Sequence, residues 1–301
     1  MLKLGVFDVA VRYGKVPALS DVSFTVQEGE RLFISGPNGA GKSSLLKAIC
    51  GAVATTHGRI EVDGDVLNGR SPEAIARLGL TMVPEGREVF GTLTVEENLR
   101  VGTGIRKDKA AIETDIDGIY QSFPILGERR HANAGALSGG QQQMLAIGRG
   151  LMTNPKLMMV DEPSLGLAPN IVDQVYETLV NLQAERGLTL IIVEQSSARA
   201  ARVGGRMVLL RGGHVAGDGD ADLLFRRVRV VVEELQQGGQ HPRRAETALQ
   251  AVIVTECLLQ RVKLVRTACD PLDGEDVGAV RLHREHQATA DGPALDQDRA
   301  R

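Results

Sequence analysis

The chain has 301 residues, a formal net charge of −3 and 3% aromatic residues, with no Trp. No apolar run approaches the roughly 20 residues that cross a bilayer, and no basic stripe with interleaved aromatics occurs in the first 225 residues. These features exclude a membrane-spanning chain and a protein whose main partner is nucleic acid. The three Cys residues have neither metal-site spacing nor a disulfide framework.

The amino-terminal segment alternates apolar and polar residues. The alternation covers residues 2–11 and 22–26 and predicts strands of an antiparallel sheet. Asp8 interrupts the short apolar run at the start of the chain, and no small-residue cleavage pattern follows it. We therefore expect a strand rather than a signal peptide, and a cytoplasmic chain. Cys50, further on, is expected to be a buried helix residue.

A glycine-rich loop at residues 36–43 has the pattern Gly-x-x-x-x-Gly-Lys-Ser. In this pattern successive backbone N–H groups cradle phosphates and the Lys adds a positive charge. An apolar run at 31–35 predicts a strand entering the loop, and residues 44–49 predict the helix leaving it. The expected nucleotide-binding residues are Gly36, Pro37, Asn38, Gly39, Ala40, Gly41, Lys42, Ser43 and Ser44.

A second apolar run of strand length, residues 155–163, ends in the two carboxylates Asp161 and Glu162. Mg²⁺ prefers hard oxygen ligands, so Ser43 and Asp161 are candidate ligands of an ion bound with the nucleotide. Glu162 would orient the attacking water. The alternative is that the acidic pair caps the next element or faces solvent.

The remaining periodicity predicts an α/β fold. Apolar runs near Ile34 and at residues 80–83, 157–160 and 190–193 predict buried parallel strands. Residues 94–151 have a helical period, and residues 207–210 and 214–217 read as a hairpin.

With Leu137-Ser138-Gly139-Gly140-Gln141, the chain resembles the ATP-binding subunits of ABC transporters over residues 2–225. The resemblance implies a P-loop NTPase of the ABC ATPase type, with a parallel core sheet, an antiparallel β subdomain and a helical subdomain at about 94–151. It also implies a sandwich dimer in which this signature binds the γ phosphate held by the other subunit. The signature residues are Ser138, Gly139, Gly140 and Gln141. Alternatively, Ser138 only caps the helix that follows.

Further positions match the family or depart from it. Tyr13 looks like the aromatic that stacks on adenine, the alternative being a half-buried strand Tyr. Glu85 stands where most relatives carry the Gln that links metal, water and the transmembrane partner. Gln195 stands where a switch His is usual. It can form a hydrogen bond at the γ phosphate but cannot act as a cation or transfer a proton at neutral pH, so we expect it only to sense that phosphate.

Glu85 and Gln195, together with residues 84–90, 94–99 and 164–169, resemble the corresponding residues of the smaller ATP-binding subunit of branched-chain amino-acid importers. That resemblance implies ATP and Mg²⁺ as cofactors. It implies integral permease subunits and a second ATP-binding subunit as partners, with a solute-binding protein reached through the permease. The expected location is the cytoplasmic face of the bacterial inner membrane, as a peripheral subunit. Importers of urea or amides remain an alternative.

Other classes are less consistent with the motifs. A soluble ABC ATPase of translation or DNA repair usually needs tandem nucleotide domains or a long coiled coil, and the stretch between Ser43 and Ser138 leaves room for little more than a helical subdomain. A P-loop kinase would leave residues 137–141 unexplained.

In the family, a groove after Glu85 receives a coupling helix of the permease. We therefore expect residues 86–101 to face that partner, with Phe90 and Leu93 as contacts, the alternative being ordinary core packing.

The resemblance ends at Phe225. Residues 226–301 are rich in Arg, Ala, Gln and Val without a clear period, although 245–265 has helical character. The segment is either a regulatory or partner-binding domain or the product of a reading-frame shift. We favour the frame shift, because the change is abrupt and the ending is polar and aperiodic.

Overall fold

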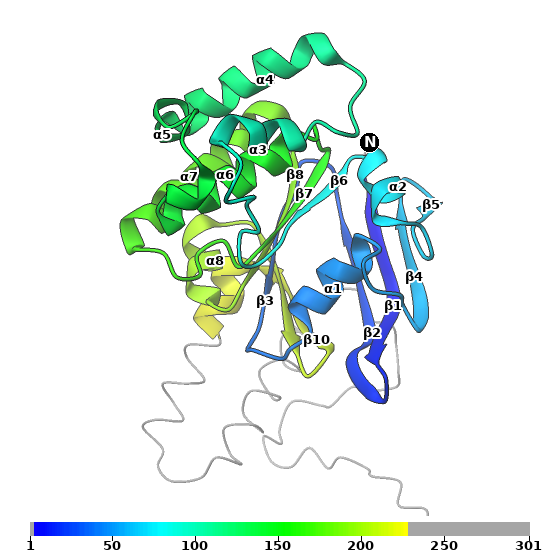
Figure 1. Cartoon of the computed structure of the whole chain (residues 1–301). Coiled ribbons are helices and arrows are strands. Elements are labelled where there is room, and N and C mark those ends of the chain that lie inside the picture. The colour runs from blue at the N-terminus through cyan, green and yellow to red at the C-terminus, as the bar shows by residue number, and fades with distance from the viewer. Residues whose placement is uncertain (1–2, 228–301) are drawn as a thin grey trace, which may run out of the picture. The chain divides into compact units, whose positions relative to one another are not determined.

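The computed structural model describes residues 3–227 (Figure 1). The two hypotheses on the segment beyond Phe225, the expected helix at 245–265, and Cys257 and Cys269 lie outside the described residues, apart from the first positions of that segment.

The amino-terminal part forms an antiparallel sheet with the strand order β2-β1-β4-β5. Leu4 and Val6 of its central strand are fully buried, and so are Val9 and Val11. The buried positions change from even to odd numbers because the pairing shifts after Val6, where Asp8 has a positive φ of 50°. The predicted strands at 2–11 and 22–26 are confirmed as β1 (Leu4–Tyr13) and β2 (Val16–Val26). Two strands that were not predicted complete the sheet, β4 (His57–Val62) and β5 (Asp65–Val66).

A second, six-stranded sheet has the order β10-β9-β3-β8-β7-β6. Every neighbouring pair in it is parallel except β9 with β10, and β7 and β8 are buried along their whole length, as expected for central parallel strands. The predicted parallel strands are confirmed. The strands are β3 (Arg31–Ser35), β6 (Leu80–Val83), β7 (Leu157–Asp161), β8 (Thr189–Glu194), β9 (Arg206–Arg211) and β10 (His214–Asp220).

Helices cover both faces of this core sheet. The helix α1 (Lys42–Ile49) lies between the two sheets, where its apolar side chains join those of both in one buried cluster (Figure 1). The other face packs against α6 (Gly139–Leu151), α7 (Pro169–Arg186) and α8 (Ser197–Val203). Cys50 is not inside α1 as predicted: it follows the last residue and is only half-buried.

The predicted helical period over 94–151 corresponds to several helices that gather at one end of the described part in Figure 1. Thr94 and Glu97 form a reciprocal capping box at the start of the first of these helices, residues 95–101. Asn98 is fully buried and hydrogen-bonds the backbone of Phe90 through both its amide oxygen and its amide nitrogen. The helices are α3 (Val95–Val101), α4 (Lys109–Ser122), α5 (Pro124–Glu128) and the 3₁₀ helix η1 (Ala134–Ala136), followed by α6; α2 (Pro72–Arg77) precedes β6.

The parallel strands bring the predicted chemical residues to one edge of the core sheet. The glycine-rich loop follows β3, Glu85 follows β6, Glu162 follows β7 and Gln195 follows β8. Since the carboxyl ends of parallel strands meet at the same edge, segments far apart in the chain converge there.

Candidate functional site

The glycine-rich loop wraps around the side chain of Lys42. The Lys42 ammonium donates to the carbonyl oxygens of Gly36 at 2.9 Å and Pro37 at 3.2 Å, and the residue is 5% exposed. The loop leads directly into the first turn of α1, whose free N–H groups and dipole favour an anion. The local structure therefore combines a fixed cation with backbone donors, which is what a phosphate requires.

The tight course of the loop depends on glycine at two positions. Gly41 has a φ of +99°, and a Cβ there would lie 2.6 Å from the Ala18 carbonyl oxygen of β2. A Cβ on Gly36 would lie 2.2 Å from the carbonyl oxygen of Leu210 in β9. The loop can pass between these strands because neither residue carries a side chain.

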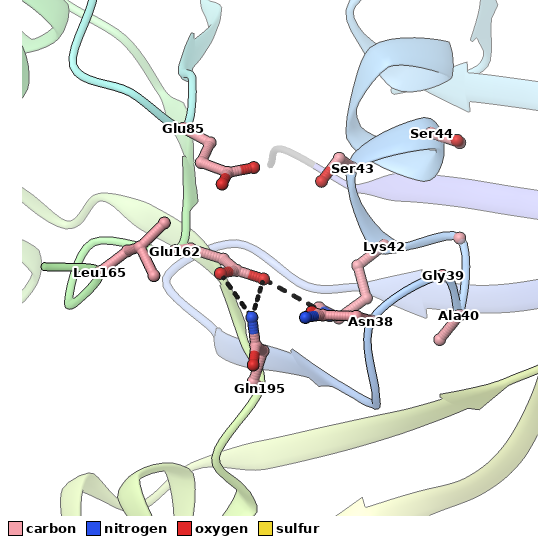
Figure 2. Close-up of a pocket in the computed structure, with 11 residues that line it drawn as sticks. Asn38, Gly39, Ala40, Lys42, Ser43, Ser44, Glu85, Glu162, Leu165 and Gln195 are labelled. Atoms are coloured by element: carbon pink, nitrogen blue, oxygen red, sulfur yellow. Dashed lines mark hydrogen bonds and ion pairs between the residues drawn. The ribbon is translucent and has the colours of Figure 1, made fainter.

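Glu162 is the central side chain of the site (Figure 2). One of its carboxylate oxygens lies 3.5 Å from the Lys42 ammonium, and the Gln195 amide nitrogen donates to the two oxygens at 3.3 and 3.0 Å. Its backbone adopts a left-handed φ of 45°, which is strained for a residue other than Gly. The hydrogen bond from its N–H to the Val193 carbonyl at 3.0 Å holds this conformation.

Asp161 lies beside Glu162 but deeper, with 2% exposure and with Oδ1 lacking a hydrogen-bond partner in the described part of the chain. Burial raises the pKa of its carboxyl group, the Ser43 hydroxyl lowers it, and the charges of Glu162 and Glu85 raise it further. An unpaired carboxylate oxygen next to a Ser hydroxyl fits a Mg²⁺ ion that takes its other ligands from phosphate and water. Residues 3–227 contain no group of three or more His, Cys, Asp or Glu that could hold a metal ion.

Asp161→Asn is expected to stabilise the nucleotide-free protein while weakening any Mg²⁺-dependent stabilisation by ATP. A raised carboxyl pKa means that stability is lost as pH rises through the folded pKa, so the ionised carboxylate destabilises the nucleotide-free protein. Removing it should add about 1 kcal/mol and raise Tm by about 3 °C. Thermal unfolding with and without Mg²⁺ and ATP measures both effects. A lower Tm for the nucleotide-free variant would contradict the prediction.

Lys42, Glu162 and Gln195 line a cavity of about 460 Å³, whereas the more deeply buried Asp161 does not line it (Figure 2). Glu85 and Gln195 both reach it, although they come from different strands of the core sheet. The cavity is lined by Asn38, Gly39, Ala40, Gly41, Lys42, Ser43, Ser44, Glu85, Glu162, Leu165 and Gln195.

Tyr13 lies next to this cavity without lining it. Its ring is 49% exposed at the end of β1, and its hydroxyl is 3.4 Å from the Ser44 hydroxyl. The exposed ring face beside the start of α1 is therefore open to a planar group bound near the loop.

The signature segment does not line the cavity in the described part of the chain. Ser138 is the N-cap of α6: its hydroxyl accepts from the Gln141 N–H at 3.3 Å, and the Gln141 side chain accepts from the Ser138 N–H at 3.0 Å. Ser138 therefore caps α6, a role that is compatible with a phosphate contact at the same helix start. Within one chain the signature and the phosphate loop are separate sites.

Sequence reasoning gave no role to Glu194 or Tyr176 and used Ser164 only as part of residues 164–169, whereas the structure joins the three residues by hydrogen bonds. No pattern in the sequence indicates that these three residues meet, because they come from a strand, a loop and a helix.

Comparison with known proteins agrees with this geometry. The family described as "ABC transporter" matches residues 19–165. The "High-affinity branched-chain amino acid transport ATP-binding protein BraG" of Pseudomonas aeruginosa is 46% identical over 207 residues, which cover 69% of this chain and 88% of that protein. The chain belongs to the ABC transporter family. As a member of that family, the protein is an ATPase.

Other relatives of this ABC subunit are more distant. A probable branched-chain amino acid transport ATP-binding protein, LivF of Archaeoglobus fulgidus, is 34% identical over 213 residues, covering 71% of this chain and 90% of that protein. The crystal structure of an ATP-binding cassette of an ABC transporter in its ADP conformation has a TM-score of 0.67 and 27% identity, over 76% of this chain and 94% of that one. Within residues 3–227 of the ABC subunit, no helix has the length and apolarity of a membrane span.

Proposed function

We propose that this ATPase drives the uptake of branched-chain amino acids through separate permease subunits. The observation that carries the proposal is the 46% identity with BraG over 88% of that protein's length. The solute is inferred from the names of the relatives, and related small solutes such as urea or amides are the alternative.

The geometry supports specific roles in hydrolysis. Lys42 and the loop N–H groups bind the β and γ phosphates, and Glu162, which also lines the cavity, orients the attacking water. Ser43 and Asp161 hold Mg²⁺, which neutralises phosphate charge when it is bound. Gln195 fixes the Glu162 carboxylate through its amide nitrogen, and Glu85 adds a carboxylate at the rim of the cavity.

The separation of the two nucleotide-binding segments supports a head-to-tail dimer. Ser138 and Gly140 lie at the positive end of α6, away from the cavity of their own chain. We assign them to the γ phosphate held by a second ATP-binding subunit, either a copy of this chain or a similar protein. The free backbone N–H groups of a helix start suit that phosphate.

Isolation of the assembled complex tests the proposed function. The full chain, tagged at its amino terminus, is purified from membranes of its own cell in mild detergent, and co-purifying proteins are identified by mass spectrometry. Two integral permeases and a second ATP-binding subunit are expected. Ribosomal or DNA-repair proteins without a permease would instead indicate a soluble ABC ATPase.

The contact with the permease is expected to include Phe90. Its ring is 49% exposed, Arg149 lies over it at 5.2 Å from the centroid, and Asn98 fixes its backbone. Phe90→Asp should abolish co-purification of the permease and leave ATP binding intact, because the ring lies outside the nucleotide cavity. Val66→Asp, at a 41% exposed position on the antiparallel sheet, is the matched control and should retain the permease. Retained association in Phe90→Asp would contradict the assignment.

A further inference from the structure

A buried carboxylate outside the nucleotide cavity has no role in the proposed reaction. Glu194, the last residue of β8, is 3% exposed. Its Oε2 accepts a hydrogen bond from the Ser164 hydroxyl at 3.1 Å, and its Oε1 accepts one from the Tyr176 hydroxyl. Both donors are neutral groups rather than cations.

Such an arrangement lowers the stability of the folded state. Burying an ionised carboxylate costs more than burying an amide of the same shape, and hydroxyl donors compensate less than a cation does. Burial, followed by the nearby charge of Glu194, raises the pKa of the Tyr176 phenol, so that its hydroxyl remains protonated and donates. Two neutral hydroxyl donors offset this cost only in part, which indicates that the carboxylate serves a purpose beyond stability.

The position of Glu194 in the chain suggests that purpose. Its two sequence neighbours both hold Glu162: the Val193 carbonyl accepts from the Glu162 N–H, and the Gln195 side chain donates to its carboxylate. Glu194 itself holds Ser164, two residues after Glu162. Three consecutive residues at the end of β8 thus fix both ends of the short turn that contains the strained backbone of Glu162.

The other end of the network is anchored in rigid structure. Tyr176 belongs to α7, is 3% exposed, and stacks on Phe33 of β3 with 6.4 Å between ring centroids. The Arg199 guanidinium group of α8 lies over the Tyr176 ring, 5.5 Å from its centroid. Because these elements pack into the main hydrophobic core, the Tyr176 hydroxyl has little freedom to follow Glu194 if the turn moves.

We infer that Glu194 is a positioning residue for ATP hydrolysis: its carboxylate holds Ser164 against Tyr176 and thereby aims Glu162 into the nucleotide cavity. The inference rests on the role proposed for Glu162. Two acceptor oxygens are required because two hydroxyl groups donate to Glu194 at once. A Gln side chain offers one acceptor oxygen and an NH₂ group, so one of the two hydroxyls loses its acceptor.

The test compares kcat, KM and thermal stability of the full chain and its variants. Glu194→Gln is expected to lower kcat for ATP about 10-fold, since small misplacements of a catalytic group cost that much or more, and to leave KM within about twofold. Its Tm should stay within about 3 °C of the parent's, because the removal of a buried charge and the loss of one hydrogen bond act in opposite directions. Ser164→Ala should lower kcat similarly, the double variant should lose little more than either single one, and Ser164→Thr should restore most of the rate.

The matched control is Glu177→Gln, which removes an exposed carboxylate one residue after Tyr176 and should behave like the parent. Parent-like kcat in both Glu194→Gln and Ser164→Ala would overturn the inference, and so would a loss of rate that accompanies a fall in Tm of more than about 3 °C. A parent chain that hydrolyses ATP while these variants are unaffected leaves the proposed function standing. A parent chain without ATPase activity would overturn both.

Discussion

Replacing Glu162 with Gln is expected to lower the rate of ATP hydrolysis by at least about a hundredfold while nucleotide binding is retained, because a positioned base contributes about that much or more. Gln keeps the shape of the side chain but not its negative charge, so the attacking water loses its orienting carboxylate. The phosphate contacts of Lys42 and the loop are unchanged. Phosphate release, ATP affinity and the size of the complex in ATP measure the three consequences.

A closed, ATP-bound dimer should accumulate in this variant, since hydrolysis is the step that would open it. Glu185→Gln, at an exposed position of α7, is the control and should hydrolyse ATP like the parent. Hydrolysis at the parent rate in Glu162→Gln would show that another group orients the water.

Replacing Lys42 with Met is expected to weaken ATP binding by about a hundredfold, which corresponds to about 2.7 kcal/mol. Met preserves most of the apolar stem but removes the ammonium that the loop carbonyls of Gly36 and Pro37 hold in place. It also leaves the buried Glu162 carboxylate without its cation at 3.5 Å. Equilibrium titration with ATP measures the affinity, and thermal unfolding measures the effect on the free protein.

Lys47→Met is the control, because Lys47 belongs to the same helix but its side chain is exposed. Its ATP affinity should match that of the parent. An undiminished affinity in Lys42→Met would mean that the backbone N–H groups alone hold the phosphates, and the assignment of Lys42 would be wrong.

Much of the fold could be predicted because its signals are local. The apolar runs that become β6, β7 and β8 are contiguous, and the capping boxes at Thr94 and Ser138 need only a residue and its third neighbour. The place of β9 could not be predicted. The predicted hairpin of β9 and β10 is confirmed, but nothing in the chain indicates that β9 also pairs in parallel with β3 and so extends the core sheet. Strand partners distant in sequence depend on which sheet edge remains open, and no local pattern encodes that.

The sequence by itself determined the family and the chemical groups of the site, because a phosphate loop and a signature are runs of consecutive residues whose function depends on their own backbone. Only the tertiary structure decided how those groups act on one another. It placed the Gln195 amide nitrogen within hydrogen-bond distance of the Glu162 carboxylate and left one Asp161 oxygen without a partner. It also brought the Ser164 and Tyr176 hydroxyls into hydrogen bonds with Glu194. The physical reason is that hydrogen bonds and buried charges depend on distances of a few ångströms between side chains from separate strands and helices, and packing of the whole sheet sets those distances.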